Sequence, residues 1–359
     1  MSSIWGRHFT IDIFGESHGP KIGVVINGLE PGTVLDFPQI RAFLDRRRAG
    51  REAWSTKRHE ADDFEIVSGY ANGFSTGTPM CVLFHNSAQR SSDYAERINR
   101  PGHADYTGFV RYNGFNDPRG GGHFSGRLTA PLVFAGAVAA QVLAKKGIYA
   151  ATHIRRIADI EDAAFDPINI TPEQAQALST MRLPLIDESK REMMETAIKQ
   201  AASEGDSVGG VVECAVWGLP AGLGSPMFDT VESRLSSLLF AVPAVKGVSF
   251  GSGFGFTQMR GSEANDAYAV KDGQIVTETN HNGGLLGGIT NGMPMVFETV
   301  IKPTASIFKP QQTVNLKTME PETVSLKGRH DACIVPRAAA VIEAAACVCM
   351  LDVMMERGL

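Results

Sequence analysis

Residues 336–358 read PRAAAVIEAAACVCMLDVMMERG, an apolar run that proline opens and glycine ends. Proline at the first helical position and glycine just past the last one are typical boundaries of an α-helix. Apolar side chains fall nearly all round the axis of this helix, so it has to be buried on several sides. The sequence leaves open whether this chain alone covers those sides or whether a partner subunit contributes.

The rest of the chain mixes strands and helices without strict alternation. Short runs rich in Val, Ile and Phe predict strands over residues 21–29, 80–86, 208–219 and 294–302. Capping and end signals predict further helices over 128–146 and 188–204 and from Asp229-x-x-Glu232. The predicted fold is therefore α+β, with antiparallel sheets and covering helices. No linker or low-complexity tract divides the chain, so we expect one large domain over residues 1–359.

Composition excludes several classes of protein. With 34 basic and 39 acidic residues, the chain lacks the basic face that broad nucleic-acid binding requires. No signal-type segment opens the sequence, and we expect no segment to reach the roughly 18 apolar residues of a membrane span. The five cysteines form no C-x-x-C pair, which favours free thiols and no metal site. We expect a soluble cytoplasmic protein.

The strongest chemical signal is Arg100-Pro-Gly-His103-Ala-Asp105 followed by Asp117-Pro-Arg119-Gly-Gly-Gly122-His-Phe-Ser-Gly-Arg127. Glycines allow the backbone to approach anionic oxygens, and the helix that starts near Gly126 adds free N–H groups and a positive dipole end. Arg100, Arg119 and Arg127 add charges with bidentate geometry. Because the Rossmann and Walker patterns are missing, we expect a phosphorylated ligand bound in some other way.

A further arginine, Arg47, is predicted to point toward the core. Asp36 can cap a helix on which Ile40 and Phe43 mark the apolar face. Arg47 lies seven residues after Ile40 and four after Phe43, so it projects with the core-facing side chains. An inward arginine needs an anion, which is consistent with a buried phosphorylated ligand.

Two histidines lie in glycine-rich loops. His18 follows Gly15-Glu-Ser17, and His103 follows Arg100-Pro-Gly. A histidine in such a loop can act as a general acid when phosphate departs. Each also has a structural alternative: a hairpin turn in which His18 satisfies backbone groups, and a hydrogen bond between His103 and Asp105.

The assembled motifs resemble those of the chorismate synthase family, in order, over about residues 5–355. They are Gly15-Glu-Ser-His18-Gly19, Arg46-Arg-Arg48, Arg100-Pro-Gly-His103-Ala-Asp-Tyr106, Gly120-Gly-Gly122 with Ser125-x-Arg127, Ala244-Val-Lys-Gly247, Lys302-Pro-Thr304 and Gly328-Arg-His-Asp331. The resemblance implies a β-α-β sandwich and a homotetramer. It also implies a lyase that converts 5-enolpyruvylshikimate 3-phosphate to chorismate by 1,4-anti elimination of phosphate with reduced FMN, the last step of the shikimate pathway.

The resemblance also implies roles for individual residues. His18 would protonate the departing phosphate, His103 would protonate or stabilise the reduced flavin, and Asp331 would assist near the flavin N5. The substrate would be held by Ser17, Arg47, Arg127 and Arg329. The flavin contacts would be His123, Phe124, Ser125, Ala244, Gly287, Lys302, Pro303, Thr304, Ala305, Ser306 and Arg329.

The chain departs from the family pattern in four places. His123 stands where many relatives have an arginine, Pro243 precedes Ala244 where Asn is common, Ala305 replaces a serine, and Ala53 stands where some members carry arginine. Two other functions remain as alternatives: a flavin or phosphometabolite binder without chemistry, and a metal-dependent hydrolase using His18, His103, His123 and Asp105. The second lacks any H-x-x-x-H or H-E-x-x-H spacing. The sequence leaves open whether NADPH or an outside reductant reduces the flavin.

Overall fold

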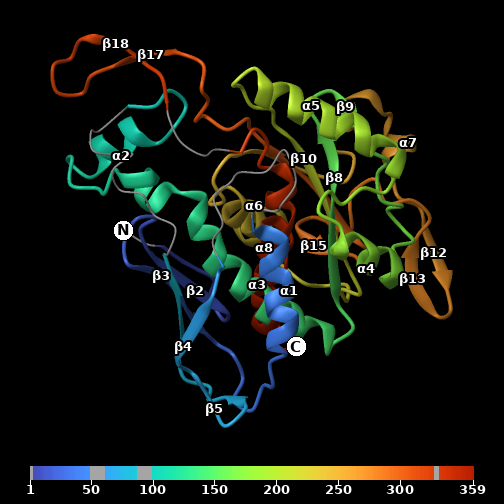
Figure 1. The fold of residues 1–359 in the computed structure, drawn as a ribbon. Coiled ribbons are helices and arrows are strands. Elements are labelled where there is room, and N and C mark those ends of the chain that lie inside the picture. The colour runs from blue at the N-terminus through green and yellow to red at the C-terminus, as the bar shows by residue number, and fades with distance from the viewer. Residues whose placement is uncertain (1–2, 49–60, 87–98, 327–330) are drawn as a thin grey trace.

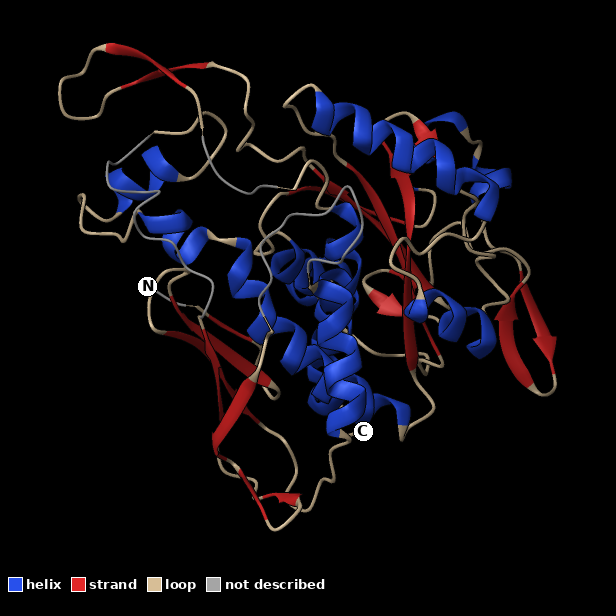
Figure 2. Cartoon of the chain, viewed as in Figure 1, coloured by secondary structure: helices blue, strands red, loops and turns tan. Residues whose placement is uncertain are grey.

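The computed structural model describes residues 3–48, 61–86, 99–326 and 331–359, which form two antiparallel sheets with a layer of helices between them (Figures 1 and 2). The first sheet has the order β1-β2-β3-β7-β4, and the second has the order β11-β16-β10-β8-β9. The strands of the first sheet are β1 (Ile4–Trp5), β2 (Thr10–Gly15), β3 (Lys21–Asn27), β4 (Phe64–Ser68) and β7 (Met80–His85). Those of the second are β8 (Tyr149–Ile157), β9 (Ile160–Glu161), β10 (Gly210–Trp217), β11 (Val245–Phe250) and β16 (Met295–Ile301). The α+β prediction is confirmed, and the four predicted strands correspond to β3, β7, β10 and β16.

The middle layer holds α1 (Phe37–Arg47), α3 (Thr129–Ala144), α6 (Val231–Leu239) and α8 (Val335–Glu356). Helix α8 lies at its centre and packs on α3, α1, α6 and strands of the second sheet. At the crossing with α3, a Cβ on Gly136 would lie only 2.3 Å from Cβ of Ala344, so glycine lets the two helices approach closely. This chain alone buries 19 of the 22 residues of α8, which answers the question left open by its sequence.

Two helical segments are long and apolar enough to cross a membrane by composition alone, Gly126–Ala144 and Val335–Glu356. The expectation that no segment reaches that length was therefore wrong. Within the structure, 78% and 94% of their most apolar windows are buried. They are the core helices of the sandwich, and a helix covered on all sides has the same composition as a membrane span.

The remaining elements lie around this sandwich. Helices α4 (Pro172–Thr180) and α5 (Arg191–Ser203) lie near the second sheet, and α4 packs on β8 (Figure 1). Helix α2 (Asp105–Arg111), helix α7 (Gly261–Ala264) and four small hairpins complete the fold: β5 (Tyr70–Ala71) with β6 (Phe74–Ser75), β12 (Tyr268–Lys271) with β13 (Gln274–Thr277), β14 (Leu285–Leu286) with β15 (Ile289–Thr290), and β17 (Gln311–Val314) with β18 (Pro321–Val324).

The helix boundaries follow the predicted caps with one exception. Asp36 accepts a hydrogen bond from the Gln39 backbone N–H and caps α1, as predicted. Helix α6 is capped by Thr230, whose side chain accepts from the Ser233 N–H, and not by Asp229. Asp229 instead forms an ion pair with Arg7, so the predicted cap was wrong by one residue.

Asp352 of α8 anchors the N-terminal segment to the core. Its Oδ1 accepts hydrogen bonds from the backbone N–H groups of Arg7, His8 and Phe9 at 2.9, 2.6 and 2.9 Å. Its other oxygen forms an ion pair with Arg234 of α6. A fully buried carboxylate with this many donors is well compensated, so it fixes the entry of the chain into the first sheet.

A buried histidine on β8 ties the second sheet to the segment that follows it. The Nδ1 of His153 lies 3.0 Å from Oδ2 of Asp162, and its Nε2 lies 2.6 Å from Oε2 of Glu213. Asp162 also accepts from the backbone N–H groups of Ile186 and Asp187. Burial alone would lower the pKa of His153, but the two carboxylates raise it above its ordinary value. The protonated imidazole therefore links two anions in the interior.

Candidate active site

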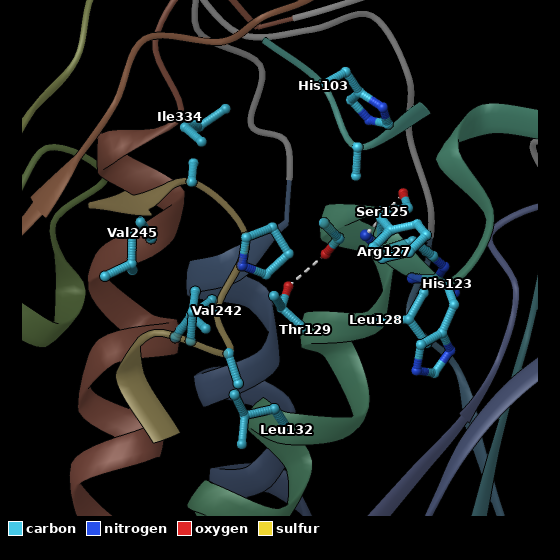
Figure 3. Close-up of a pocket in the computed structure, with 18 of the residues that line it drawn as sticks. His103, His123, Ser125, Arg127, Leu128, Thr129, Leu132, Val242, Val245 and Ile334 are labelled. Atoms are coloured by element: carbon cyan, nitrogen blue, oxygen red, sulfur yellow. Dashed lines mark hydrogen bonds between the residues drawn. The ribbon is translucent and has the colours of Figure 1, made fainter. Parts of the chain in front are cut away.

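The described residues enclose a cavity of about 1040 Å³ between the first sheet, the middle helices and β11. Cationic side chains and imidazoles line its polar part, among them Arg47, Arg100, Arg127, Lys302, His18 and His103. Figure 3 shows Val242, Val245 and Ile334 on one side of the cavity and His103, His123 and Arg127 on the other. A cavity of this size, apolar on one side and cationic on the other, suits a ring-shaped ligand together with an anion.

Arg47 and Arg127 meet in the cavity wall. Arg47 ends α1 and is buried, as its helical phase predicts. One carboxylate bridges the two side chains: Asp62 Oδ2 accepts from Arg47 Nη1 at 2.6 Å, and Asp62 Oδ1 accepts from Arg127 Nη1. Thr129 Oγ1 accepts from Arg47 Nε at 3.0 Å. Burial lowers the pKa of Arg47 to about 10, opposed by Asp62, and the guanidinium stays charged at neutral pH.

Asp331 precedes α8 and faces the same cavity. Its Oδ2 lies 2.5 Å from Nη1 of Arg337, and Arg337 Nε donates to the backbone carbonyl of Arg47 at 2.9 Å. Arg337 therefore connects the end of α1 to Asp331. Sequence reasoning missed Arg337 and Asp62, although both line the cavity.

The predicted glycine run lies between the two loop histidines. A Cβ on Gly120 would lie 2.1 Å from Cε1 of His18, and a Cβ on Gly121 would lie 3.1 Å from Cε1 of His103. Gly120 and Gly121 have φ of 60° and 90°, a region that favours glycine. The backbone of this turn therefore packs directly against both imidazole rings.

His18 lies in the turn between β2 and β3 and is almost fully buried. Ser17 Oγ lies 2.9 Å from Nδ1 of His18, and the Ser17 N–H donates to the carbonyl of Gly122 at 3.1 Å. The two interpretations of this motif are thus compatible, because the hairpin turn also presents His18 to the cavity. Ser17 does not line the cavity but orients the imidazole that does.

His103 is held by a carboxylate and an arginine. Its Nδ1 donates to Asp105 Oδ1 at 2.8 Å, and Arg100 pairs with the same carboxylate, with Nε 2.7 Å from Oδ2. Burial alone would raise the pKa of Asp105, but the hydrogen bonds from Arg100 and His103 bring it below its ordinary value. The hydrogen bond to Asp105, which was the structural alternative for His103, is therefore present. His103 also lines the cavity, so the structural and the functional interpretation are compatible.

His123, which departs from the expected family pattern, is held at both ring nitrogens. Its Nδ1 lies 2.8 Å from the carbonyl oxygen of Gly15, which can only accept, so Nδ1 carries the hydrogen. Its Nε2 lies 3.0 Å from the hydroxyl of Ser3, which can donate to it. The imidazole therefore connects the N-terminal segment to the turn that carries His18.

Two loops, around Ala244 and around Lys302, complete the wall of the cavity. Lys302 donates from its backbone N–H to the carbonyl of Ala244 at 2.9 Å, and from Nζ to the carbonyl of Gly102. Ala244 has φ of 75°, an uncommon conformation for a non-glycine residue that marks local strain. Thr304 Oγ1 is buried and has no hydrogen-bond partner among the described residues. Such an atom in a cavity wall is expected to bond to a ligand or to water.

Most of the predicted site residues converge on this cavity. Its lining includes His18, His103, Asp331, Arg47, Arg127, His123, Phe124, Ser125, Ala244, Lys302, Pro303, Thr304, Ala305 and Ser306. Gly287, in the turn between β14 and β15, does not line it. Arg329 lies outside the described residues.

Arg119, expected to join the anion site, does not line the cavity. It folds back on Asp117, with Nη2 2.7 Å from Oδ2. The expectation for Arg119 was wrong because a carboxylate two residues away binds the guanidinium locally.

Comparison with known proteins shows which family this chain belongs to. A profile of the chorismate synthase family matches residues 9–355. The chorismate synthase of Dehalococcoides mccartyi is 45% identical over 361 residues, which cover 100% of this chain and 98% of that protein. The chain belongs to the chorismate synthase family.

Other members of the family agree with this assignment. The chorismate synthase of Thermococcus gammatolerans is 47% identical over 354 residues, 98% of this chain and 97% of that protein. A crystal structure of chorismate synthase superimposes with a TM-score of 0.75 at 26% identity, covering 98% of this chain and 93% of that one. The predicted family, enzyme class and chorismate-synthase-like fold are confirmed.

Proposed function

We propose that this chain catalyses the 1,4-anti elimination of phosphate from 5-enolpyruvylshikimate 3-phosphate to give chorismate, the last step of the shikimate pathway, with reduced FMN. The observation that carries the proposal is the convergence of Arg47, Arg127, His18 and His103 on one cavity in a chain that matches the family along its length. A departing phosphate needs positive charge and a proton donor, and this cavity contains both.

The cavity fits a flavin beside the substrate. Its volume of about 1040 Å³ exceeds what one small anion needs. Val242, Val245 and Ile334 form an apolar wall suited to a planar ring, and the unpartnered hydroxyl of Thr304 offers a polar contact at its edge. Reduced FMN, when bound, would lend an electron to the substrate as the allylic C–O bond breaks and would take it back with the C6 hydrogen, so the elimination would involve no net redox change. The residues proposed to hold it are His123, Phe124, Ser125, Ala244 and 302–306, with Arg329; Gly287, which does not line this cavity, is not among them.

The chain's own residues bind the anions and supply protons. Arg47 and Arg127 hold the phosphate, with Arg329 proposed as a further contact and Ser17 orienting His18. His18, protonated, donates its proton to an oxygen of the departing phosphate. The anion that leaves is thereby neutralised in part, which lowers the barrier to cleavage of the C–O bond.

The other two catalytic residues lie toward the flavin in this proposal. His103 donates from Nδ1 to Asp105, so the imidazolium form of His103, with both ring nitrogens protonated, would present a proton to the reduced flavin from its Nε2 edge, which faces Gly121. Asp331, oriented by Arg337, assists near the flavin N5. Both roles depend on rigid placement, which the ion pairs of each residue provide.

The test is turnover under anaerobic conditions. The purified chain with dithionite-reduced FMN is expected to form chorismate from the enolpyruvyl shikimate phosphate. His18→Ala and His103→Ala are each expected to lower kcat by about 10²–10⁴, as for lost acid–base groups. Unchanged turnover in both variants would refute these roles. The same assay with FMN and NADPH in place of dithionite decides whether the chain reduces its own flavin.

We also propose a single-domain subunit in a cytoplasmic homotetramer. One cluster of buried hydrophobic residues spans both sheets and the middle helices, which supports one domain. The hairpin of β12 and β13 exposes Tyr268, Val270 and Ile275, an apolar surface suited to a subunit contact. All five cysteines are free thiols, which favours a reducing compartment. Light scattering at micromolar concentration should give four times the 38.6 kDa chain mass, and a monomeric mass would contradict the assembly.

A further inference from the structure

The proposed anion site contains a carboxylate as well as cations. Asp62 lines the cavity, and no part of its side chain is exposed. Because its two oxygens accept from Arg47 and Arg127, this carboxylate occupies the place between the two guanidinium groups where a phosphate oxygen would otherwise bind. A phosphate held by these arginines therefore has a fixed negative charge as its neighbour.

Asp62 is held rigidly in this position. Its backbone carbonyl accepts from Arg41 Nη1 at 2.9 Å, and its φ of 53° is a conformation that few residues other than glycine adopt, although aspartate tolerates it. Burial alone would raise the pKa of Asp62, but Arg47 and Arg127 hold it below its ordinary value, so the side chain is an anion at neutral pH.

Arg127 is equally fixed. Its Nε donates to Asn86 Oδ1 at 2.9 Å, and its Nη2 donates to the carbonyl of His85 at 3.1 Å. These neutral acceptors orient the guanidinium without cancelling its charge. Orientation of Arg127 therefore does not depend on Asp62 alone, and the main effect of the Asp62 carboxylate on a bound anion is electrostatic.

We propose that Asp62 weakens the hold of Arg47 and Arg127 on phosphate, so that the phosphate released in each turnover can leave. Together, the two arginines and Asp62 carry a net charge of +1 instead of +2. Like charges a few ångströms apart in a buried site repel strongly, so removal of the Asp62 charge has to strengthen the binding of phosphate. This inference rests on the proposed function for the identity of the anion. A purely structural ion bridge predicts the opposite, because loss of the bridge would loosen the arginines and weaken binding.

The experiment measures binding of inorganic phosphate to the full chain by isothermal titration calorimetry at pH 7.5. Asp62→Asn removes the charge and keeps the shape. Asp63→Asn is the matched control, since Asp63 is 76% exposed and pairs with Arg41 at 3.3 Å outside the cavity. We expect Asp62→Asn to lower the Kd for phosphate at least tenfold and Asp63→Asn to leave it unchanged. Equal or weaker binding by Asp62→Asn overturns the proposal.

Turnover separates this inference from the proposed function. Inorganic phosphate should inhibit chorismate formation by Asp62→Asn at concentrations at least tenfold lower than those that inhibit the unaltered chain. If the unaltered chain forms no chorismate, the proposed function fails, whereas the calorimetric comparison of phosphate binding still decides the role of Asp62.

A second measurement applies if Asp62→Asn folds poorly, because the variant leaves two buried cations without their anion. The melting temperatures of the variant and the unaltered chain are then compared in sodium phosphate and sodium chloride of equal ionic strength. We expect phosphate to raise the melting temperature of Asp62→Asn more than that of the unaltered chain, because the added anion replaces the lost carboxylate. An equal or smaller rise overturns the proposal.

Discussion

Replacement of Gly120 by alanine should move a proposed catalytic histidine while leaving the fold intact. The new methyl group would lie 2.1 Å from Cε1 and 2.2 Å from Nδ1 of His18, and 2.7 Å from Oγ of Ser17. Carbon atoms in contact need about 3.5 Å, so the imidazole has to move by about 1.4 Å or the glycine turn has to shift by as much. A misplacement of about 1 Å can cost about 10²-fold in rate, and we expect kcat to fall by about that factor.

The cost in stability should be small and can be measured separately. Alanine at φ of 60° costs about 1–2 kcal/mol. Gly73→Ala is the matched control, since Gly73 has φ of 88° in the small β5–β6 hairpin and no atom within 4 Å of the added Cβ. Both variants should lose about 1–2 kcal/mol of unfolding free energy in urea, but only Gly120→Ala should lose activity. If kcat of Gly120→Ala stays within threefold of the control, the proposed packing of Gly120 against His18 is refuted.

Three further predictions concern the glycine turn and two buried ionic contacts. Gly121→Ala places its methyl group 3.1 Å from Cε1 of His103, so kcat should fall less than in Gly120→Ala, and an equal or larger fall would contradict the geometry. His153→Gln should lower the unfolding free energy at pH 6 by about 3–5 kcal/mol, because Glu213 loses its charged partner. The raised pKa of His153 means that its contribution is complete below about pH 6.5 and is lost as pH rises through the raised value. The unaltered chain should therefore lose more stability between pH 6 and pH 9 than the variant, and parallel profiles in urea would contradict this. Asp352→Ala should cost about 3–5 kcal/mol, since it removes one of the two carboxylates that pair with Arg234 and leaves the backbone N–H groups of residues 7–9 without their acceptor, and a loss below 1 kcal/mol would show that water replaces the carboxylate.

The sequence predicted those parts of the fold that depend on local pattern. The all-round apolar run of α8 required burial, and the phase of Arg47 on α1 placed it among core residues, because helical geometry fixes both within a few turns. The glycine run before α3 likewise indicated close backbone approach, and the structure shows Gly120 and Gly121 against two imidazoles.

The sequence could not predict contacts that depend on how distant segments meet. The Asp62 carboxylate bonds to Arg127, 65 positions away in the chain, and no local pattern marks that pair. Arg119 looked equivalent to Arg127 because the two flank the glycine run 120–122, but Asp117 binds Arg119 locally. The Asp-x-Arg spacing at 117–119 was the signal that could have shown this. Arg337 lies on the first turn of α8, and its role became visible only when α1 was seen beside it.

The most direct test of the central claim is a crystal structure of the chain with FMN and inorganic phosphate. Our account predicts phosphate within hydrogen-bond distance of Arg47, Arg127 and His18, with the isoalloxazine ring against Val242, Val245 and Ile334 in the same cavity. A flavin bound outside this cavity, or a phosphate that contacts neither Arg47 nor Arg127, would contradict the account.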